Sequence, residues 1–312
     1  MRQLISLAIS LIILGCLYWQ IDIAELTAVL FQSDSVWLIA GLGMVIPITM
    51  LTAMRFVWMA PSKNQISYLE SLRLILAASL MNVVLPSKMG DVAKSVFMTS
   101  KDGLSNVQAL SLVMFEKISD FLALLFWCVF GLFLFPHDHW LLWGLAIIIL
   151  AGLVFGIAML ISVHFVQRFF RVICILVPVR LEKKIARLEE GWIEMNHHIY
   201  GQKARFVGIM FYSIFLWLLH MVQFWLFIQA LNVFVPFIDN LALTPLAILI
   251  GLMPFTFAGI GTRDAAFVFI YSSYFTAATG AALGVLATMR YVIPAFFGIP
   301  FLYRYMDTRI VK

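Results

Sequence analysis

The sequence has few charged residues: Asp, Glu, Lys and Arg together make up 12% of its 312 residues. Soluble domains carry about 25% charged and about 45–50% apolar residues, whereas 63% of this chain is hydrophobic. A soluble core cannot bury that excess, so we expect an integral membrane protein. The apolar runs are too long for barrel strands and do not alternate, so we expect the membrane-spanning elements to be helices.

Cysteine is also scarce, and familiar catalytic motifs are missing. Cys16, Cys128 and Cys174 stand singly in apolar surroundings, so we expect neither a disulfide nor a metal centre. The sequence contains no Walker loop, nucleophile elbow, HExxH or GxGxxG motif. We therefore expect no cofactor, no ATP hydrolysis and no enzymatic activity.

The basic residues indicate a membrane topology. The formal net charge of +5 comes from residues that flank apolar helices, which is typical of topology signals and anionic lipid rather than nucleic acid. Loops at about 20–35, 136–140 and 232–240 contain no Lys or Arg. Since positive residues stay inside, we expect the N- and C-termini to be cytoplasmic in a cell (inner) membrane. The apolar segments lie at roughly 4–20, 36–59, 70–85, 106–135, 140–165, 206–231, 241–258, 264–277 and 279–303.

Two parts of the chain do not fit simple crossings. Segment 70–85 begins and ends near cytoplasmic charge, and the three pieces after residue 240 are too close together for three full spans. We predict an all-α polytopic membrane protein with about six full transmembrane helices and two oppositely oriented re-entrant hairpins. Each hairpin carries a Pro, then a Gly, an acid and a base, which is typical of inverted-repeat transporters. The alternative is that Pro and Gly break helices at two unrelated turns.

We expect residues 1–312 to form a single transmembrane domain, with a cytoplasmic amphipathic connector at 166–205. Between 181 and 199, apolar residues recur at spacings of three and four, and charged residues cover the other face. This helix is predicted to lie on the lipid headgroups or to dock under the bundle. A connecting elbow is favoured over a regulatory role.

Charges inside apolar segments mark the candidate site, because charge is costly in lipid. Glu116, Lys117 and Asp120 lie in segment 106–135, with Glu116 about 15 Å deep and on the same face as Asp120. Two such acids indicate a cation, a proton or an arginine partner, or alternatively a structural ion pair between helices. Arg55 is either a snorkelling arginine at the interface or an arginine that meets lipid phosphate.

The hairpins add further candidates. Helices that restart at about Gly90 and Gly261 point unpaired backbone N–H groups into the membrane, and such ends attract anions. The predicted substrate-binding residues are Arg55, Asn82, Pro86, Lys88, Gly90, Asp91, Lys94, Glu116, Lys117, Asp120, Gly259, Gly261, Arg263, Asp264 and Arg290.

Four of these stretches resemble motifs of one family. Residues 52–58 (TAMRFVW), 82–94 (NVVLPSKMGDVAK), 115–120 (FEKISD) and 258–264 (AGIGTRD) are similar, in order and spacing, to motifs of the lysylphosphatidylglycerol synthase transmembrane family, also called flippase-like domain proteins. This sequence differs at four positions within them. Lys94 and Lys117 stand where the family usually has Arg, Asp264 where it has Glu, and Ala258 where it commonly has Gly.

The resemblance implies a polytopic domain with inverted-repeat hairpins that is associated with moving lipids between leaflets. In the synthases, a soluble aminoacyl transferase follows this domain. Because the sequence ends at Lys312, we expect a stand-alone member without the synthase domain.

Three functions remain open. The first is translocation of an anionic or polyprenyl/sugar-linked lipid, with a lipid-synthesis enzyme as a candidate partner. In it, Arg55, Lys88, Lys94 and Arg263 hold phosphate, and Asp91, Glu116, Asp120 and Asp264 orient these bases or take up protons. The second is a glycosyltransferase that uses a polyprenyl-phosphate sugar and acids of the outer loop. The third is a non-catalytic scaffold subunit of a lipid-synthesis complex.

Overall fold

The computed structural model describes residues 22–60, 66–84, 90–101, 105–134, 140–176, 185–193, 203–252 and 261–310, and within these ranges the regular structure is helical throughout. The labelled helices are, in chain order, α2 (Ile23–Phe31), α3 (Ser35–Gly43), α4 (Val45–Met59), α5 (Tyr68–Val84), α6 (Gly90–Lys101), α7 (Asn106–Leu134), α8 (Trp140–Ile161), α9 (Val163–Leu176), α11 (Lys203–Ala230), α12 (Phe237–Gly251), α13 (Thr262–Ile270) and α14 (Ala277–Ile310).

Five helices in the described part of the chain are long and apolar enough to cross a membrane. They match five of the six predicted spans, and α3 and α4 together form the first of them. The predicted span at 4–20 lies outside the described residues. The five spans are Ser35–Met59, Asn106–Leu134, Trp143–Ile161, Ala204–Ala230 and Ala277–Tyr303.

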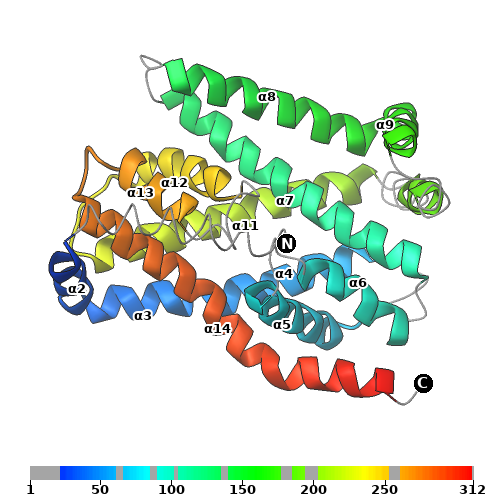
Figure 1. The fold of residues 1–312 in the computed structure, drawn as a ribbon, viewed down its shortest axis with the longest axis horizontal. Coiled ribbons are helices and arrows are strands. Elements are labelled where there is room, and N and C mark those ends of the chain that lie inside the picture. The colour runs from blue at the N-terminus through cyan, green and yellow to red at the C-terminus, as the bar shows by residue number, and fades with distance from the viewer. Residues whose placement is uncertain are drawn as a thin grey trace.

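The first hairpin is formed by α5 and α6, which pack against each other. Its open end lies at the C-terminal end of α14 (Figure 1). There the Tyr305 hydroxyl donates a hydrogen bond to Glu70 at the start of α5. The Tyr305 ring stacks on Phe97 of α6, with centroids 4.8 Å apart. At the open end of the hairpin, both of its helices are therefore anchored on the same residue of α14.

The second hairpin, α12 with α13, enters from the opposite end of the bundle (Figure 1). Its open end lies at the start of α14, where the Tyr274 hydroxyl donates to Asp239 Oδ2 at 2.6 Å. The prediction of two oppositely oriented hairpins is confirmed. The tips that join their helices, at 85–89 and 253–260, lie outside the described residues.

The two halves of the chain interlock through these hairpins. Helix α5 packs along α14, and α12 packs along α7. In both contacts the backbones of the two helices come close together at a glycine. A Cβ at Gly298 would lie 2.1 Å from the Leu76 carbonyl oxygen, and one at Gly131 would lie 2.4 Å from the Ala242 carbonyl oxygen. Each hairpin is thus held by the last span of the other half, as in an inverted repeat built on small-residue packing.

The described parts of two loops that lack basic residues, 22–35 and 232–240, lie together at one end of the bundle, around α2. The Thr276 hydroxyl donates to Glu25 Oε1 at 3.0 Å, and the Asn232 side-chain amide donates to the Gln32 carbonyl oxygen at 2.8 Å. Helix α9 and the C-terminus lie at the far end (Figure 1). The charge asymmetry of the sequence therefore corresponds to the two ends of the folded bundle.

Residues 185–193 form a helix within the predicted amphipathic stretch at 181–199. Trp192 is buried and donates its indole N–H to the Met159 carbonyl oxygen at 3.3 Å. Its ring also packs against Phe115 of α7, with centroids 6.4 Å apart. The described part of this stretch therefore packs against α7 and α8 through Trp192.

Candidate functional site

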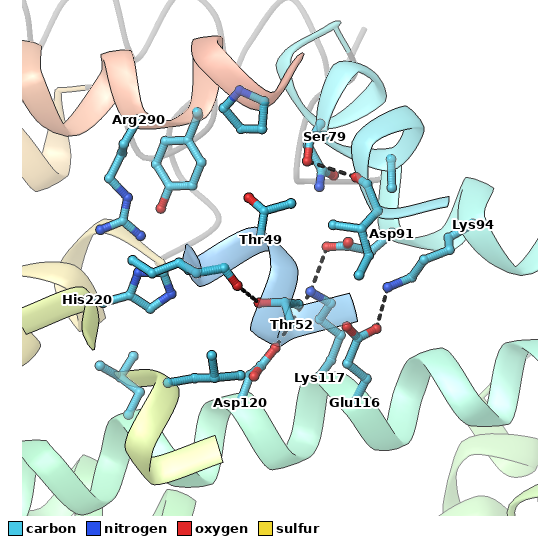
Figure 2. A pocket seen from close by; sticks show the side chains of 18 of the residues that line it. Thr49, Thr52, Ser79, Asp91, Lys94, Glu116, Lys117, Asp120, His220 and Arg290 are labelled. Atoms are coloured by element: carbon cyan, nitrogen blue, oxygen red, sulfur yellow. Dashed lines mark hydrogen bonds and ion pairs between the residues drawn. The ribbon is translucent and has the colours of Figure 1, made fainter. Parts of the chain in front are cut away.

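A cavity of about 750 Å³ is bordered by both hairpins and by α4, α7, α11 and α14 (Figure 2). Polar and charged side chains from helices far apart in the sequence converge on it. The predicted site residues that line it are Arg55, Asn82, Asp91, Lys94, Glu116, Lys117, Asp120, Arg263 and Arg290.

Arg55 lies deep in the bundle and is only 1% exposed. Its Nη1 is 2.5 Å from Asp120 Oδ1 and donates to Ser213 Oγ at 2.8 Å, while Nη2 is 3.9 Å from Glu116 Oε1. The alternative of a snorkelling arginine is therefore wrong. The arginine partner predicted for the two acids of α7 is Arg55.

Two lysines complete the network around α7. Lys94 forms a buried ion pair with Glu116, and its ammonium group lies 4.4 Å from the centroid of the Phe56 ring. Lys117 Nζ is 2.9 Å from Asp91 Oδ2. Each of these cations faces a carboxylate, so the group carries no net charge. We call it the ion-pair cluster: Arg55, Lys94, Lys117, Asp91, Glu116 and Asp120.

A fourth ion pair lies at the start of α13. Arg263 Nη2 is 3.0 Å from Asp264 Oδ1 and also donates to the Gly284 carbonyl oxygen at 3.1 Å and Thr288 Oγ1 at 2.7 Å. Asp264 Oδ2 accepts the Gly261 backbone N–H at 3.0 Å and so caps the helix. Asp264 does not line the cavity, and its contacts position Arg263 and the end of α13.

Asp264→Asn is expected to lower the free energy of unfolding by about 1–3 kcal/mol, because Arg263 loses its charged acceptor while an amide oxygen still caps the helix. Thermal unfolding in detergent micelles would measure the loss. Asp34→Asn is the matched control, because Asp34 is also a helix cap, accepting the Val36 N–H at 2.8 Å, but has no arginine beside it among its described contacts. Equal effects of the two substitutions would contradict the role assigned to the Arg263 pair.

Arg290 differs from the other cations of the cavity. It is 8% exposed, and its guanidinium lies against the rings of Phe224 and Tyr291, at 5.0 and 4.9 Å from their centroids. Within the described ranges, no carboxylate lies within 4.0 Å of it and its Nη1 has no hydrogen-bond partner. Figure 2 shows Arg290 and His220 on one side of the cavity, and Lys94 and Glu116 on the other.

The predicted glycines shape the hairpins rather than line the cavity. Helix α6 begins at Gly90, where a Cβ would lie 2.3 Å from the Ala78 carbonyl oxygen of α5. Gly261 has a φ of 94°, a region that favours glycine. Because Asp264 already accepts the Gly261 N–H, that helix end does not offer this group to an anion. Three predicted site residues lie outside the described part of the chain: Pro86, Lys88 and Gly259.

Several uncharged polar side chains of the cavity were not predicted as site residues. Thr49 and Thr52 line it together with Arg55. Their spacing of three residues places them on one helix face, so the sequence could have indicated that they belong to the site. His220 of α11 also lines the cavity. Gln223, one turn further along α11, donates its side-chain amide N–H to the Gly41 carbonyl oxygen at 2.9 Å.

Residues 3–298 match the protein family described as Lysylphosphatidylglycerol synthase TM region. The chain belongs to this family. The match covers all the residues that line the cavity, so the ion-pair cluster and Arg290 fall within the family domain. No curated protein shows significant similarity to the chain.

Membership in the lysylphosphatidylglycerol synthase TM region family agrees with the architecture. Together with the five membrane-spanning helices, it identifies a multi-pass membrane protein with a lipid-related, flippase-like role. The resemblance inferred from four short motifs is confirmed.

Proposed function

We propose that this protein moves an anionic lipid headgroup between the leaflets of the membrane through the cavity described above. The observation that carries the proposal is a charged cavity of about 750 Å³ inside an apolar bundle, bordered by two hairpins that enter from opposite ends. Transporters with inverted repeats place their substrate site where such broken helices meet. The lipid tails would stay in the bilayer while the headgroup crosses.

The proposal includes an energy source and a cellular setting, which we infer from sequence features. With no nucleotide-binding motif in the chain, transport would be driven by a gradient or run downhill, without catalysis or a cofactor. From the distribution of basic residues we infer that the protein lies in a cell membrane with both termini on the cytoplasmic side. A lipid-synthesis enzyme remains a candidate partner, since it would supply the lipid.

The structure gives less support to glycosyl transfer. That function needs free acids at the outer end, but Asp22 and Asp34 accept backbone N–H groups at the starts of α2 and α3, and Glu25 accepts the Thr276 hydroxyl. These contacts use the acids as helix caps and cross-links between segments. They favour transport as the function of the buried charges.

Filling the cavity is expected to stop transport. Thr49→Phe would place a ring in the cavity without removing a charged side chain, whereas the neighbouring Met50 is 46% exposed on the outer face of the same helix. In proteoliposomes, wild type and Met50→Phe should speed leaflet exchange of headgroup-labelled phosphatidylglycerol or a polyprenyl phosphodiester sugar. Thr49→Phe should be as slow as empty vesicles.

Two outcomes would contradict the proposal. One is exchange by the folded wild-type protein that is no faster than in empty vesicles, with a proton or ion gradient supplied. The other is equal exchange by Thr49→Phe and Met50→Phe, since transport would then not pass through this cavity.

A further inference from the structure

We propose that Arg290 is the anion-binding residue of the cavity and that the cavity is matched to a headgroup with one net negative charge, as in a lipid phosphodiester. This inference rests on the proposed function and adds the charge class of the lipid. It also moves the anion site away from Arg55, Lys94 and Arg263, the described residues that sequence motifs indicated.

The pairing of the other cations leads to this assignment. Arg55 faces Asp120, Lys94 faces Glu116, Lys117 faces Asp91, and Arg263 faces Asp264, at 3.0 Å or less. A phosphate would have to displace a carboxylate to bind any of them. Among the described residues that line the cavity, Arg290 is the cation without a carboxylate partner.

The surroundings of Arg290 hold its side chain in place without neutralising it. Phe224 and Tyr291 lie against the guanidinium and offer cation–π contacts. Aromatic faces leave the edge of a guanidinium, with its N–H donors, available to an anion, and this planar fork matches the oxygens of a phosphate. The unpartnered Nη1 is such a donor.

Charge balance then selects the ligand class. An unpaired charge buried in a membrane protein is costly, and a single phosphodiester would compensate the one that Arg290 leaves. A phosphomonoester carries up to about two negative charges near neutral pH and would leave an excess. Phosphatidylethanolamine has no net charge. The lysyl ester of phosphatidylglycerol has two ammonium groups and one phosphate, so its headgroup would add positive charge beside Arg290.

Competitive lipid binding would test the assignment. Native mass spectrometry of the full-length purified protein would compare phosphatidylglycerol, a polyprenyl phosphodiester sugar, phosphatidic acid, phosphatidylethanolamine and lysyl-phosphatidylglycerol. One or both phosphodiesters should be retained best, and which of them binds identifies a glycerophospholipid or an isoprenoid source. Arg290→Gln should weaken that binding by about tenfold or more.

Matched variants separate binding from misfolding. Arg290→Gln removes an unpaired buried charge, so it should unfold at the same temperature as wild type or higher. Arg168→Gln, at an exposed arginine of α9, should bind lipid like wild type. Unchanged phosphodiester binding by folded Arg290→Gln, or wild-type binding of lysyl-phosphatidylglycerol or phosphatidic acid as tight as that of the phosphodiesters, would overturn the assignment.

A second variant tests the charge match. Asp91→Asn makes the cavity one charge more positive, and Lys117 tolerates the loss because its side chain is 45% exposed. The lipid preference of Asp91→Asn should shift from the phosphodiesters toward phosphatidic acid. An unshifted lipid preference would contradict the proposed match between cavity charge and headgroup charge. Arg290-dependent binding without leaflet exchange would retain this inference and reject transport. Leaflet exchange that is unchanged in Arg290→Gln would retain transport as the function and reject Arg290 as the anion-binding residue.

Discussion

Glu116→Leu is expected to lower the free energy of unfolding by about 3–5 kcal/mol, because it leaves a buried cation without its partner. Lys94 would lose its ion pair and Arg55 its second carboxylate, and both side chains are almost fully buried. Thermal unfolding in detergent micelles, followed by size-exclusion chromatography, would measure the loss.

The paired replacement distinguishes the charge from the packing. Lys94→Met with Glu116→Leu removes one charge of each sign, so the ion-pair cluster stays neutral and most of the lost stability should return. The double variant should still lose leaflet exchange if the cluster serves transport. A double variant as unstable as Glu116→Leu would show that the ion pair itself was not the cause. Full leaflet exchange by the double variant would instead show that this ion pair serves the fold and not transport.

Gly298→Ala and Gly131→Ala are each expected to destabilise the protein by about 1–3 kcal/mol through overpacking. The new methyl groups would meet backbone carbonyls of α5 and α12, at 2.1 and 2.4 Å. Backbone cannot rotate away as a side chain can, so one helix must shift. The two substitutions lie far apart in sequence but disturb equivalent contacts of the inverted repeat.

Gly144→Ala gives these substitutions a control of opposite sign. A Cβ at Gly144 of α8 would meet nothing within 4 Å, and alanine favours a helix over glycine by about 0.5–1 kcal/mol. Thermal unfolding should therefore show Gly144→Ala unchanged or more stable. If Gly298→Ala behaved in the same way, α5 and α14 would not be packed as closely as described.

The sequence predicted the candidate site as a set of residues, whereas the contacts among these residues come from the structure. Local rules identified Arg55, Glu116 and Asp120, because charge within an apolar segment is costly wherever it lies. The sequence could not predict which of these residues form ion pairs, because Arg55 meets Asp120 only after α4 and α7 pack together. The role of Arg290 was hidden for the same reason. An unpaired charge is recognised only when the positions of all nearby carboxylates are known.

The sequence by itself determined that this protein is helical and membrane-spanning, because lipid requires long apolar segments whose backbone groups are satisfied internally. Periodicity, basic loops and Pro–Gly breaks also indicated the two hairpins and their opposite orientation. Only the tertiary structure decided that each hairpin packs on the other half of the chain, at Gly131 and Gly298. It likewise decided which of the cavity's described charges remains uncompensated, because electrostatic balance depends on distances of a few ångströms between helices that are remote in sequence.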